Sequence, residues 1–359
     1  MKFATIKGWG KCLPPAVLTN DDISTFLDTN DEWIVSRTGM KERRVSHVHV
    51  SDLSYVACVR ALAAAGVNAE EVDLIIFGSC TADEVVPNTA SRIQLLLGIK
   101  TAASFDLNTA CTSGMYALSV ASAMIKTGAV RTALVIGAEV ISVAQDWTDR
   151  NVAVLFGDGA AAFVLQGTEE QEGLLADELG CYADSRDILR ANGYGLRYID
   201  GQNILGTIWW DFLGQEIFKK AVMGMCEASA GAIAQAGLST DQIDLVVPHQ
   251  ANLRIIEAVV KRLGVSGRVF LNIHKYGNMS AATTPVALVE AIEEGHVKPG
   301  MHILLPAFGG GLTYSAHIIR WGERVTPVHI ADIELPPCEK SALEMVREHM
   351  SRPRAGGPF

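Results

Sequence analysis

The sequence predicts an α/β protein built from two related halves, and two observations carry this prediction. First, short apolar runs alternate with helical patterns, which is typical of strands buried between layers of helices. Second, the segment "GVNAEEVDLIIFGS" from Gly66 aligns without a gap with "GLSTDQIDLVVPHQ" from Gly237, which indicates an internal duplication. Another ungapped match, between "CTSGMYALSVASAMIKTGAV" and "NMSAATTPVALVEAIEEGHV", makes Cys111 and Asn278 equivalent positions.

Each half is expected to follow the order strand, helix, strand, helix, strand. In the first half, the patterns predict these elements at 72–80, 88–98, 103–108, 113–127 and 131–138. In the second half, they predict them at 243–248, 252–263, 269–273, 279–294 and 301–307. Two further apolar runs, at 160–166 and 314–321, are expected to be the closing strands of the two halves.

The predicted domains are an N-terminal half at 1–171, a C-terminal half at 172–321 and a C-terminal extension at 322–359. We expect the segment 181–213 to be irregular, because it is rich in glycine and asparagine around its centre. In the extension the composition shifts to proline and charged residues, with one helix expected at 341–350. No chemistry is assigned to this extension.

Composition excludes several classes of protein. The 359 residues carry a formal net charge of −10, which argues against nucleic-acid binding because phosphate contacts need a basic face. No apolar run approaches the roughly 18 residues that span a bilayer, and the N-terminus lacks the apolar core of a signal peptide. We therefore expect a cytoplasmic protein without a membrane segment. The 7 cysteines include no CxxC pair, so neither a disulfide framework nor a metal site is indicated.

Cys111 lies between the end of a predicted strand and the start of a predicted helix. Unpaired backbone N–H groups and the helix dipole at such a position favour a thiolate and are expected to lower the pKa of the thiol. Cys111 is therefore a candidate nucleophile. The alternative is a small buried residue without a chemical role.

His249 and Asn278 occupy corresponding junctions in the second half. His249, in "VVPHQAN", follows a buried strand, and Asn278, in "HKYGNMSAATTP", begins the helix paired by symmetry with that of Cys111. Alone, His249 could be an ordinary loop residue and Asn278 a helix N-cap. Three such groups at corresponding strand and helix ends instead indicate one catalytic site.

Six stretches together carry a family resemblance: "DEWIVSRTGMKERR", "NTACTSG", "TDRNVAVLFGDGAAA", "HQANLRI", "HKYGNMSAA" and "AFGGGLTY". Across residues 1–321 the chain resembles the β-ketoacyl-acyl-carrier-protein synthase III family of the thiolase superfamily. The resemblance implies the thiolase-like five-layered fold and a homodimer. It also implies a decarboxylating Claisen condensation between an acyl-CoA primer and malonyl-acyl-carrier protein, with acyl-CoA as a substrate and no resident cofactor.

The resemblance also assigns roles to the site. Cys111 would carry the acyl group as a thioester, and the backbone N–H groups of Cys111 and Gly310 would form the oxyanion hole. His249 and Asn278 would donate hydrogen bonds to the enolate left by decarboxylation. Phe308 would place the malonyl carboxylate against an apolar face, or it simply packs in the core. We expect Thr112 and Ser113 to form the wall beside the thioester.

Binding residues also follow from the resemblance. Trp33, Arg37 and Arg150 would clamp the adenine of CoA, with Asn252 near its pantetheine arm. Without the resemblance, Trp33 and Arg37 could be a surface pair, four residues apart on a helix. A basic patch would bind the acidic carrier protein, although such charges usually form a solvated helix face. The patch residues are Lys219, Arg254, Lys261 and Arg262.

Val86 is the candidate determinant of primer length. In the family, the residue before the proline of "DEVVPNTAS" reaches across the dimer interface and closes the partner's acyl tunnel. Valine there would leave room for a medium-chain primer, unless it is an ordinary interface residue.

Two alternative functions remain open. One is a specialised-metabolite condensing enzyme or acyltransferase that uses Cys111 with a different acceptor. The other is a non-catalytic partner of another synthase, which the presence of Cys111 disfavours.

Overall fold

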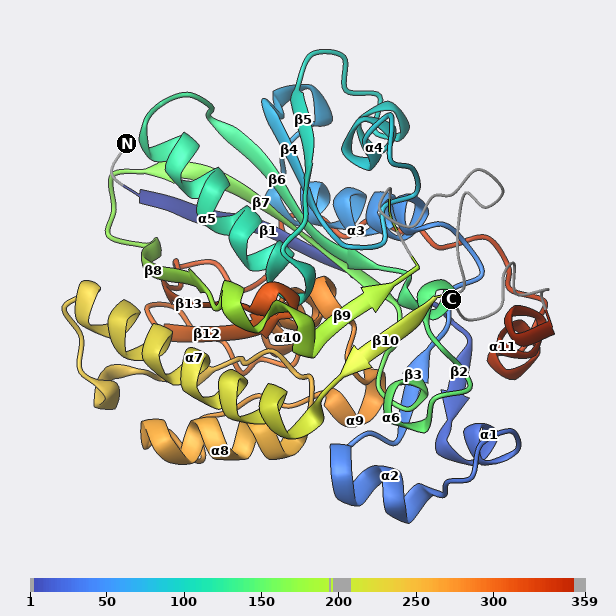
Figure 1. The fold of residues 1–359 in the computed structure, drawn as a ribbon. Helices are drawn as coiled ribbons and strands as arrows, with labels where there is room; N and C mark the ends of the chain where they lie inside the picture. Colours follow the sequence, from blue (N-terminus) through green and yellow to red (C-terminus); the bar gives the residue numbers. More distant parts are fainter. Residues whose placement is uncertain (1–2, 194, 196–207, 352–359) are drawn as a thin grey trace.

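The computed structural model describes residues 3–193, 195 and 208–351, and these residues form five alternating layers of helices and sheets (Figure 1). In the view of Figure 1, α3 (Val50–Ala65) and α4 (Thr89–Leu96) cover the upper sheet. Between the two sheets lie α5 (Ser113–Lys126) and α10 (Thr283–Glu293). Below the lower sheet lie α7 (Gly214–Gln235) and α8 (Leu253–Leu263), which pack on each other. The architecture is thus the five-layered α/β arrangement that we expected.

The two sheets share one plan of strand order and direction. The first sheet runs β1 (Phe3–Cys12), β7 (Gly159–Thr168), β6 (Thr132–Glu139), β4 (Leu74–Gly78) and β5 (Ala103–Leu107). The second runs β8 (Gly173–Cys181), β13 (Thr313–Arg320), β12 (His302–Gly309) and β11 (Leu245–Val246). In both sheets the first two pairings are antiparallel and the next is parallel. This correspondence agrees with the duplication read from the sequence.

The central helices are hydrophobic because both of their faces meet a sheet. Ile125 on α5 and Ile292 on α10, which the duplication aligns, belong to one buried cluster between the sheets. The outer helices bury only one face, as α8 shows with buried Ile255, Ile256 and Val259 and a charged outer side. The layer order therefore follows from which faces are apolar.

Two predictions of local structure were wrong. The strand expected at 269–273 is reduced to a single bridge between Val246 and Val269, and the chain then forms the short helix α9 (Ile273–Tyr276). The segment 181–213 contains a paired hairpin, β9 (Leu189–Asn192) with β10 (Trp209–Phe212), although residues 194 and 196–207 lie outside the described residues.

A small unit beside the layers carries Trp33 and Arg37, two of the CoA-binding candidates. It pairs β2 (Val17–Thr19) with β3 (Glu42–Arg44) and contains α1 (Asn20–Ser24) and α2 (Asp31–Thr38). The side chain of Asn30 caps α2 by accepting a hydrogen bond from the Trp33 N–H at 2.8 Å. Gly39, with φ of 81°, ends α2 in the left-handed conformation that suits glycine. This helix also packs against α8.

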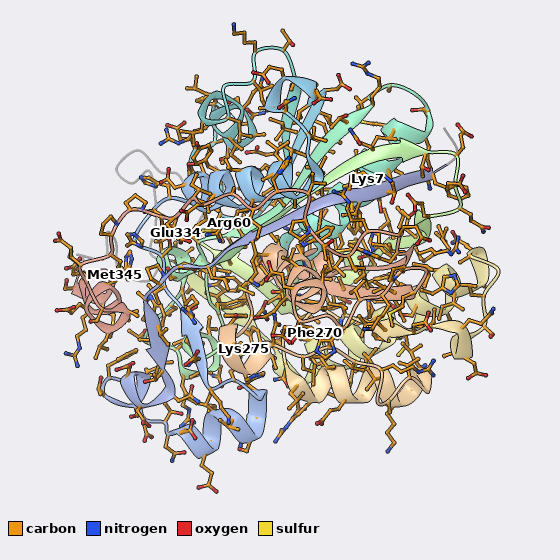
Figure 2. The ribbon with its side chains drawn as sticks, turned by 180° about the vertical axis from the view of Figure 1, so that it is seen from behind. Lys7, Arg60, Phe270, Lys275, Glu334 and Met345 are labelled. Atoms are coloured by element: carbon orange, nitrogen blue, oxygen red, sulfur yellow. The ribbon has the colours of Figure 1, made fainter. Side chains whose placement is uncertain are left out.

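The tail after β13 forms a strap (322–351) that returns along the first half. Its Val328 N–H donates to the Ala64 carbonyl at 3.0 Å, and Glu334 pairs with Arg60 on α3 at 2.8 Å (Figure 2). Ile333 packs against the hydrophobic cluster formed by α3 and the outer face of the first sheet. The strap is therefore part of the folded unit.

The strap ends in α11 (Ala342–Ser351), where a helix was expected. Ser341 and Glu344 form a capping interaction at its start, because the Ser341 N–H donates to the Glu344 carboxylate at 2.7 Å. Met345 and Val346 are buried in the cluster that also contains Ile23 of α1. The strap thus packs against the small unit that carries α2.

Candidate active site

One cavity of about 1040 Å³ brings together residues from both halves. Cys111, His249, Asn278, Phe308 and Gly310 all line it. They come from strand ends and from the starts of the two central helices, where the duplication places equivalent backbone positions. The cavity therefore contains the whole set of candidate catalytic groups.

Cys111 sits in a 3₁₀ turn (Ala110–Thr112) between β5 and α5. The residue before it, Ala110, has φ of 53°, and Gly277 before the equivalent Asn278 has φ of 64°. A Cβ atom on Gly309 would lie 2.8 Å from the Cys111 nitrogen, so only glycine allows this approach. The backbone N–H groups of Cys111 and Gly310 both act on the Cys111 sulfur to lower the pKa of the thiol. The two N–H groups therefore serve the same reacting atom, the Cys111 sulfur.

The expected lowering of the thiol pKa was wrong. Burial raises the pKa of the Cys111 thiol to about 11, while hydrogen bonds from Ser280 and from the two backbone N–H groups act in the opposite direction. The nearby carboxylate of Glu139 raises this pKa further. At this site desolvation outweighs the helix start, so the resting side chain is a thiol.

His249 follows β11 and is only 2% exposed. Its backbone N–H donates to the carbonyl of Pro306 on β12 at 2.8 Å, which fixes the residue beside the second sheet. Burial lowers the pKa of the imidazole to about 3. The ring is therefore neutral at physiological pH and acts as a hydrogen-bond donor or acceptor without charge.

The orientation of the Asn278 amide is fixed by its oxygen. Oδ1 accepts hydrogen bonds from the Ser280 N–H at 2.8 Å and from the Thr283 hydroxyl at 3.3 Å. Within the described residues, no acceptor is hydrogen-bonded to Nδ2. Because Asn278 lines the cavity, its NH₂ group is available as a donor there.

Phe308 is buried on β12 and also lines the cavity, so packing and a role in the site are compatible. Thr112 and Ser113 are fully buried and do not line it, which corrects the expected wall. The Thr112 hydroxyl instead lies 2.8 Å from the hydroxyl of Thr313, which donates to the Gly310 carbonyl at 3.1 Å. Thr112 therefore ties the glycine loop to the Cys111 turn.

The Trp33 ring lies beside two guanidinium groups at one end of the lining. The central carbon of Arg37 lies 4.8 Å from the ring centroid and that of Arg150 lies 4.7 Å from it. Arg150, at the start of α6 (Arg150–Ala153), also donates to the Asp28 carbonyl at 2.8 Å. Trp33 and Arg37 line the cavity, as does Asn252, the N-cap of α8.

The basic residues lie on α7 and α8. Lys219 and Arg254 line the cavity, and Lys261 and Arg262 continue along the exposed side of α8. Arg254 also donates to the Ser36 carbonyl on α2 at 2.9 Å. Three of these cations thus extend from the cavity along α8 and the fourth, Lys219, lies on α7, while Arg254 bridges to α2.

Val86 lies outside the cavity lining, in the segment between β4 and α4, and is 84% exposed. Its neighbour Val85 is 77% exposed. Two large apolar side chains therefore face solvent close to β5, the edge strand of the first sheet.

Sequence reasoning missed Glu139, Ser280 and Cys80, which surround the Cys111 thiol. Glu139 ends the otherwise apolar strand β6, and Ser280 and Cys80 line the cavity. The sequence did mark Glu139 as unusual, because an acidic residue at the end of a fully buried strand needs hydrogen-bond partners.

Comparisons with known proteins agree with this site. Residues 105–183 match the family model described as 3-oxoacyl-(acyl-carrier-protein) synthase III, and residues 233–321 match the model of its C terminal. The solved structure of 3-oxoacyl-(acyl-carrier-protein) synthase III from Aquifex aeolicus is similar, with a TM-score of 0.84 and 41% identity. It covers 89% of this chain and 100% of that chain, which confirms the thiolase-like five-layered fold.

A priming β-ketosynthase from a polyketide biosynthetic pathway has a TM-score of 0.85 at 31% identity, covering 90% of this chain and 97% of that one. β-Ketoacyl-acyl-carrier-protein synthase III 2 of Vibrio cholerae is 52% identical over 98% of this chain and 98% of its own length, so the match extends into the strap. The synthase III of Roseiflexus castenholzii is 45% identical over 89% of this chain and 98% of its own length. This chain belongs to the β-ketoacyl-acyl-carrier-protein synthase III family.

Proposed function

We propose that this chain condenses an acyl-CoA primer with malonyl-acyl-carrier protein, releasing CO₂ and CoA and giving a 3-oxoacyl-acyl-carrier protein. Membership of the synthase III family supports this activity. The observation that carries it is that Cys111, His249 and Asn278 line one cavity. The enzyme is an acyltransferase that works through an acyl-Cys111 intermediate.

In the first half-reaction, the Cys111 sulfur attacks the thioester carbonyl of acyl-CoA. The negative charge that develops on the carbonyl oxygen is held by the N–H groups of Cys111 and Gly310. Their shared action on the sulfur supports this role. By comparison with other oxyanion holes, each donor contributes about 3 kcal/mol to stabilising the transition state. CoA leaves and the acyl group stays on Cys111.

In the second half-reaction, malonyl thioester loses CO₂ and leaves an enolate, which attacks the acyl-Cys111 carbonyl. The Asn278 amide and neutral His249 donate hydrogen bonds to the thioester oxygen where the enolate charge collects. The fixed orientation of the Asn278 amide and the lowered pKa of His249 support donors in place of a charged acid. Phe308 presents an apolar face to the departing carboxylate.

The substrates reach the cavity by two surfaces. Trp33, Arg37 and Arg150 bind the adenine of CoA by stacking and cation–π contact, with Asn252 near the pantetheine arm. The acidic carrier protein docks on the basic patch Lys219, Arg254, Lys261 and Arg262, and the continuity of this patch with the cavity supports that path.

The active form is a homodimer in the cytoplasm. The unpaired edge of β5 and the exposed Val85 and Val86 support an interface on that side of the first sheet. No helix among the described residues combines the length and apolar character required to span a bilayer. The net charge of −10 supports the absence of a nucleic-acid partner. The domain boundaries after residues 171 and 321 stay a prediction.

The second candidate function is condensation in a specialised pathway, on the same Cys111 but with a different acceptor. The likeness to a priming β-ketosynthase of polyketide biosynthesis favours this alternative. A non-catalytic role beside another synthase is less well supported, because Cys111 and the groups around it are present.

Intact-protein mass after incubation with acyl-CoAs of graded length tests the first half-reaction. Each accepted primer adds one acyl mass at Cys111, and Cys111→Ala abolishes the adduct. Product analysis with malonyl-acyl-carrier protein and with malonyl-CoA then identifies the acceptor. Full acylation of Cys111→Ala contradicts the proposed nucleophile.

A further inference from the structure

Gln250 is a buried side chain that the proposed chemistry does not use. It follows His249 in the chain, is 0% exposed and does not line the cavity. Its Oε1 accepts hydrogen bonds from the Asn272 N–H and the Ile273 N–H, both at 2.8 Å, and its Nε2 donates to the Phe270 carbonyl at 3.1 Å. One side-chain amide therefore holds three backbone groups of a single short segment.

These hydrogen bonds explain why the strand expected at 269–273 does not form. Backbone pairing with β11 stops at Phe270, whose N–H donates to the Val246 carbonyl at 3.0 Å. From the Phe270 carbonyl onward the partner is the Gln250 side chain, because a primary amide offers the same kinds of donor and acceptor as a peptide group. The Gln250 side chain thus takes the place of the missing strand pairing.

The segment held by Gln250 leads directly to Asn278. α9 begins at Ile273, and the Gly277 N–H closes it by donating to the Ile273 carbonyl at 3.0 Å. Only residues 274–277 lie between Ile273 and Asn278. A shift of α9 is therefore passed on to the Asn278 amide.

Glu290 on α10 holds the same segment from the other side. Its carboxylate accepts hydrogen bonds from the Asn272 side chain and from the Tyr276 hydroxyl, both at 2.8 Å. Asn272 is thus fixed twice, through its backbone by Gln250 and through its side chain by Glu290. A helix as short as α9 has little stability of its own, so these side chains determine where it lies.

We propose that Gln250 is a positioning residue that sets the separation of the two enolate donors, His249 and Asn278. It is bonded to His249 through the chain and tied to Asn278 through α9. Among the described residues, the hydrogen-bond partners of the Gln250 side chain all lie at 270–273, and none belongs to the Cys111 turn. Gln250 therefore acts on malonyl decarboxylation and not on acylation. This inference rests on the donor roles proposed for His249 and Asn278.

Gln250→Met tests this role, because methionine has the length of glutamine but cannot make these hydrogen bonds. CO₂ release from malonyl-acyl-carrier protein, measured in the Cys111→Ala background, falls about 100-fold, the loss that a misplacement of about 1 Å causes. Acylation of Cys111 by acyl-CoA, measured by intact mass in Gln250→Met alone, keeps its wild-type rate. Unchanged decarboxylation overturns the proposal, and so does an equal fall in both steps.

A double-mutant cycle with Asn278→Ala separates positioning from a general loss of stability. Once the Asn278 amide is absent, the separation of the two donors no longer matters. Gln250→Met then lowers CO₂ release by less than about threefold beyond Asn278→Ala alone, because residues that act as one unit are not additive. The full 100-fold loss in this background overturns the proposal.

Gln250→Glu is the conservative variant. Its carboxylate keeps an oxygen that accepts from the N–H groups of Asn272 and Ile273, and it loses only the donor to Phe270. Decarboxylation therefore stays within about tenfold of the wild type, the equivalent of one hydrogen bond. A loss as large as that of Gln250→Met overturns the anchoring role of the two N–H groups. If Gln250→Met does not fold, Gln250→Asn replaces it in every measurement, because its amide is one methylene too short to reach the segment.

Gln145→Met is the matched control. Gln145 is also a buried glutamine, 7% exposed, whose Nε2 donates to the Ala153 carbonyl at 2.7 Å, and it does not line the cavity. The same change there leaves CO₂ release at the wild-type rate, and an equal loss overturns the assignment to position 250.

The positioning role and the proposed function fail differently. A wild-type enzyme that neither accepts an acyl group on Cys111 nor releases CO₂ from malonyl-acyl-carrier protein refutes the proposed function. A wild-type enzyme active in both steps, with normal decarboxylation by Gln250→Met, refutes the positioning role alone.

Discussion

At the scale of single residues, the direction of the Asn278 amide limits what this side chain can do. Its oxygen is engaged by Ser280 and Thr283, so only the NH₂ group is left for a ligand. A side chain held in this way donates without reorganising when charge develops on the substrate. This preorganisation distinguishes Asn278 from an ordinary helix cap.

Asn278→Asp tests the donor directly. Aspartate keeps both accepted hydrogen bonds but replaces the NH₂ group by an oxygen that repels the enolate. We expect malonyl decarboxylation to fall about 100-fold or more, while acylation of Cys111 stays close to wild type. Release of CO₂ and the acyl-enzyme mass measure the two steps. An equal loss in both steps would contradict this division of roles.

The neutral state of His249 predicts that the rate of malonyl decarboxylation does not depend on pH in the neutral range. Because burial lowers its pKa to about 3, the imidazole does not change charge between pH 5 and 8. Malonyl decarboxylation by Cys111→Ala, which cannot be acylated, should therefore show no inflection near pH 6.5 in that range. A rate that rises as the pH falls through 6.5 would instead identify the imidazolium as the active form.

The same residues show where sequence reasoning fails. The order of motifs predicted Cys111, His249, Asn278 and Gly310 as candidates, and the structure brings them to one cavity. The pKa of Cys111 was wrong because it depends on burial and on Glu139, which lies 28 positions later in the chain and enters from another strand. Local patterns describe the start of a helix but not the dielectric around it.

At the scale of elements, strands with both faces buried were the easiest to predict. β4, β6 and β12 are continuous apolar runs and lie where they were expected. β1 contains two glycines and two lysines, and β8 is partly exposed, so neither gave a clear strand signal. Their place beside β7 and β13 depends on pairing with distant strands, which no local window contains.

The basic residues of α8 are predicted to bind the carrier protein. Lys261 and Arg262 lie on its exposed side beyond the cavity. We expect Lys261→Glu combined with Arg262→Glu to raise KM for malonyl-acyl-carrier protein about 10-fold at low salt, with the effect fading as salt increases. Acylation by acyl-CoA should not change.

Lys298→Glu provides the control for this variant, because it reverses an exposed charge after α10, outside the patch. If the control raises KM as much as the double variant does, net charge and not the patch determines carrier binding.

At the scale of the whole molecule, Val86 predicts the length of the primer. A side chain smaller than an aromatic would leave room for about four more methylenes, each contributing about 0.8 kcal/mol on burial. We therefore expect kcat/KM to favour hexanoyl-CoA, which has four more methylenes, over acetyl-CoA by roughly 3 kcal/mol, on the order of a hundredfold. Val86→Phe should shift this preference toward acetyl-CoA and leave malonyl use intact.

Val85→Phe is the matched control for this prediction, because it adds the same ring one position away on the same exposed segment. A wild-type preference for acetyl-CoA would refute the tunnel argument. An equal shift in both variants would show that bulk anywhere on this surface, and not position 86, alters the primer.

The strap covers α3, which the ribosome makes much earlier than the strap. Arg60 on α3 donates to the carbonyl of Ile333, and the two residues are 273 positions apart in the chain. At ribosomal rates of about 5–20 residues per second, that interval lasts on the order of tens of seconds. Throughout it, the apolar surface of α3 that Ile333 and Leu335 cover in the finished protein is exposed on the nascent chain. The surface of α3 that the strap covers is therefore made early in synthesis and is covered only after the strap has been made.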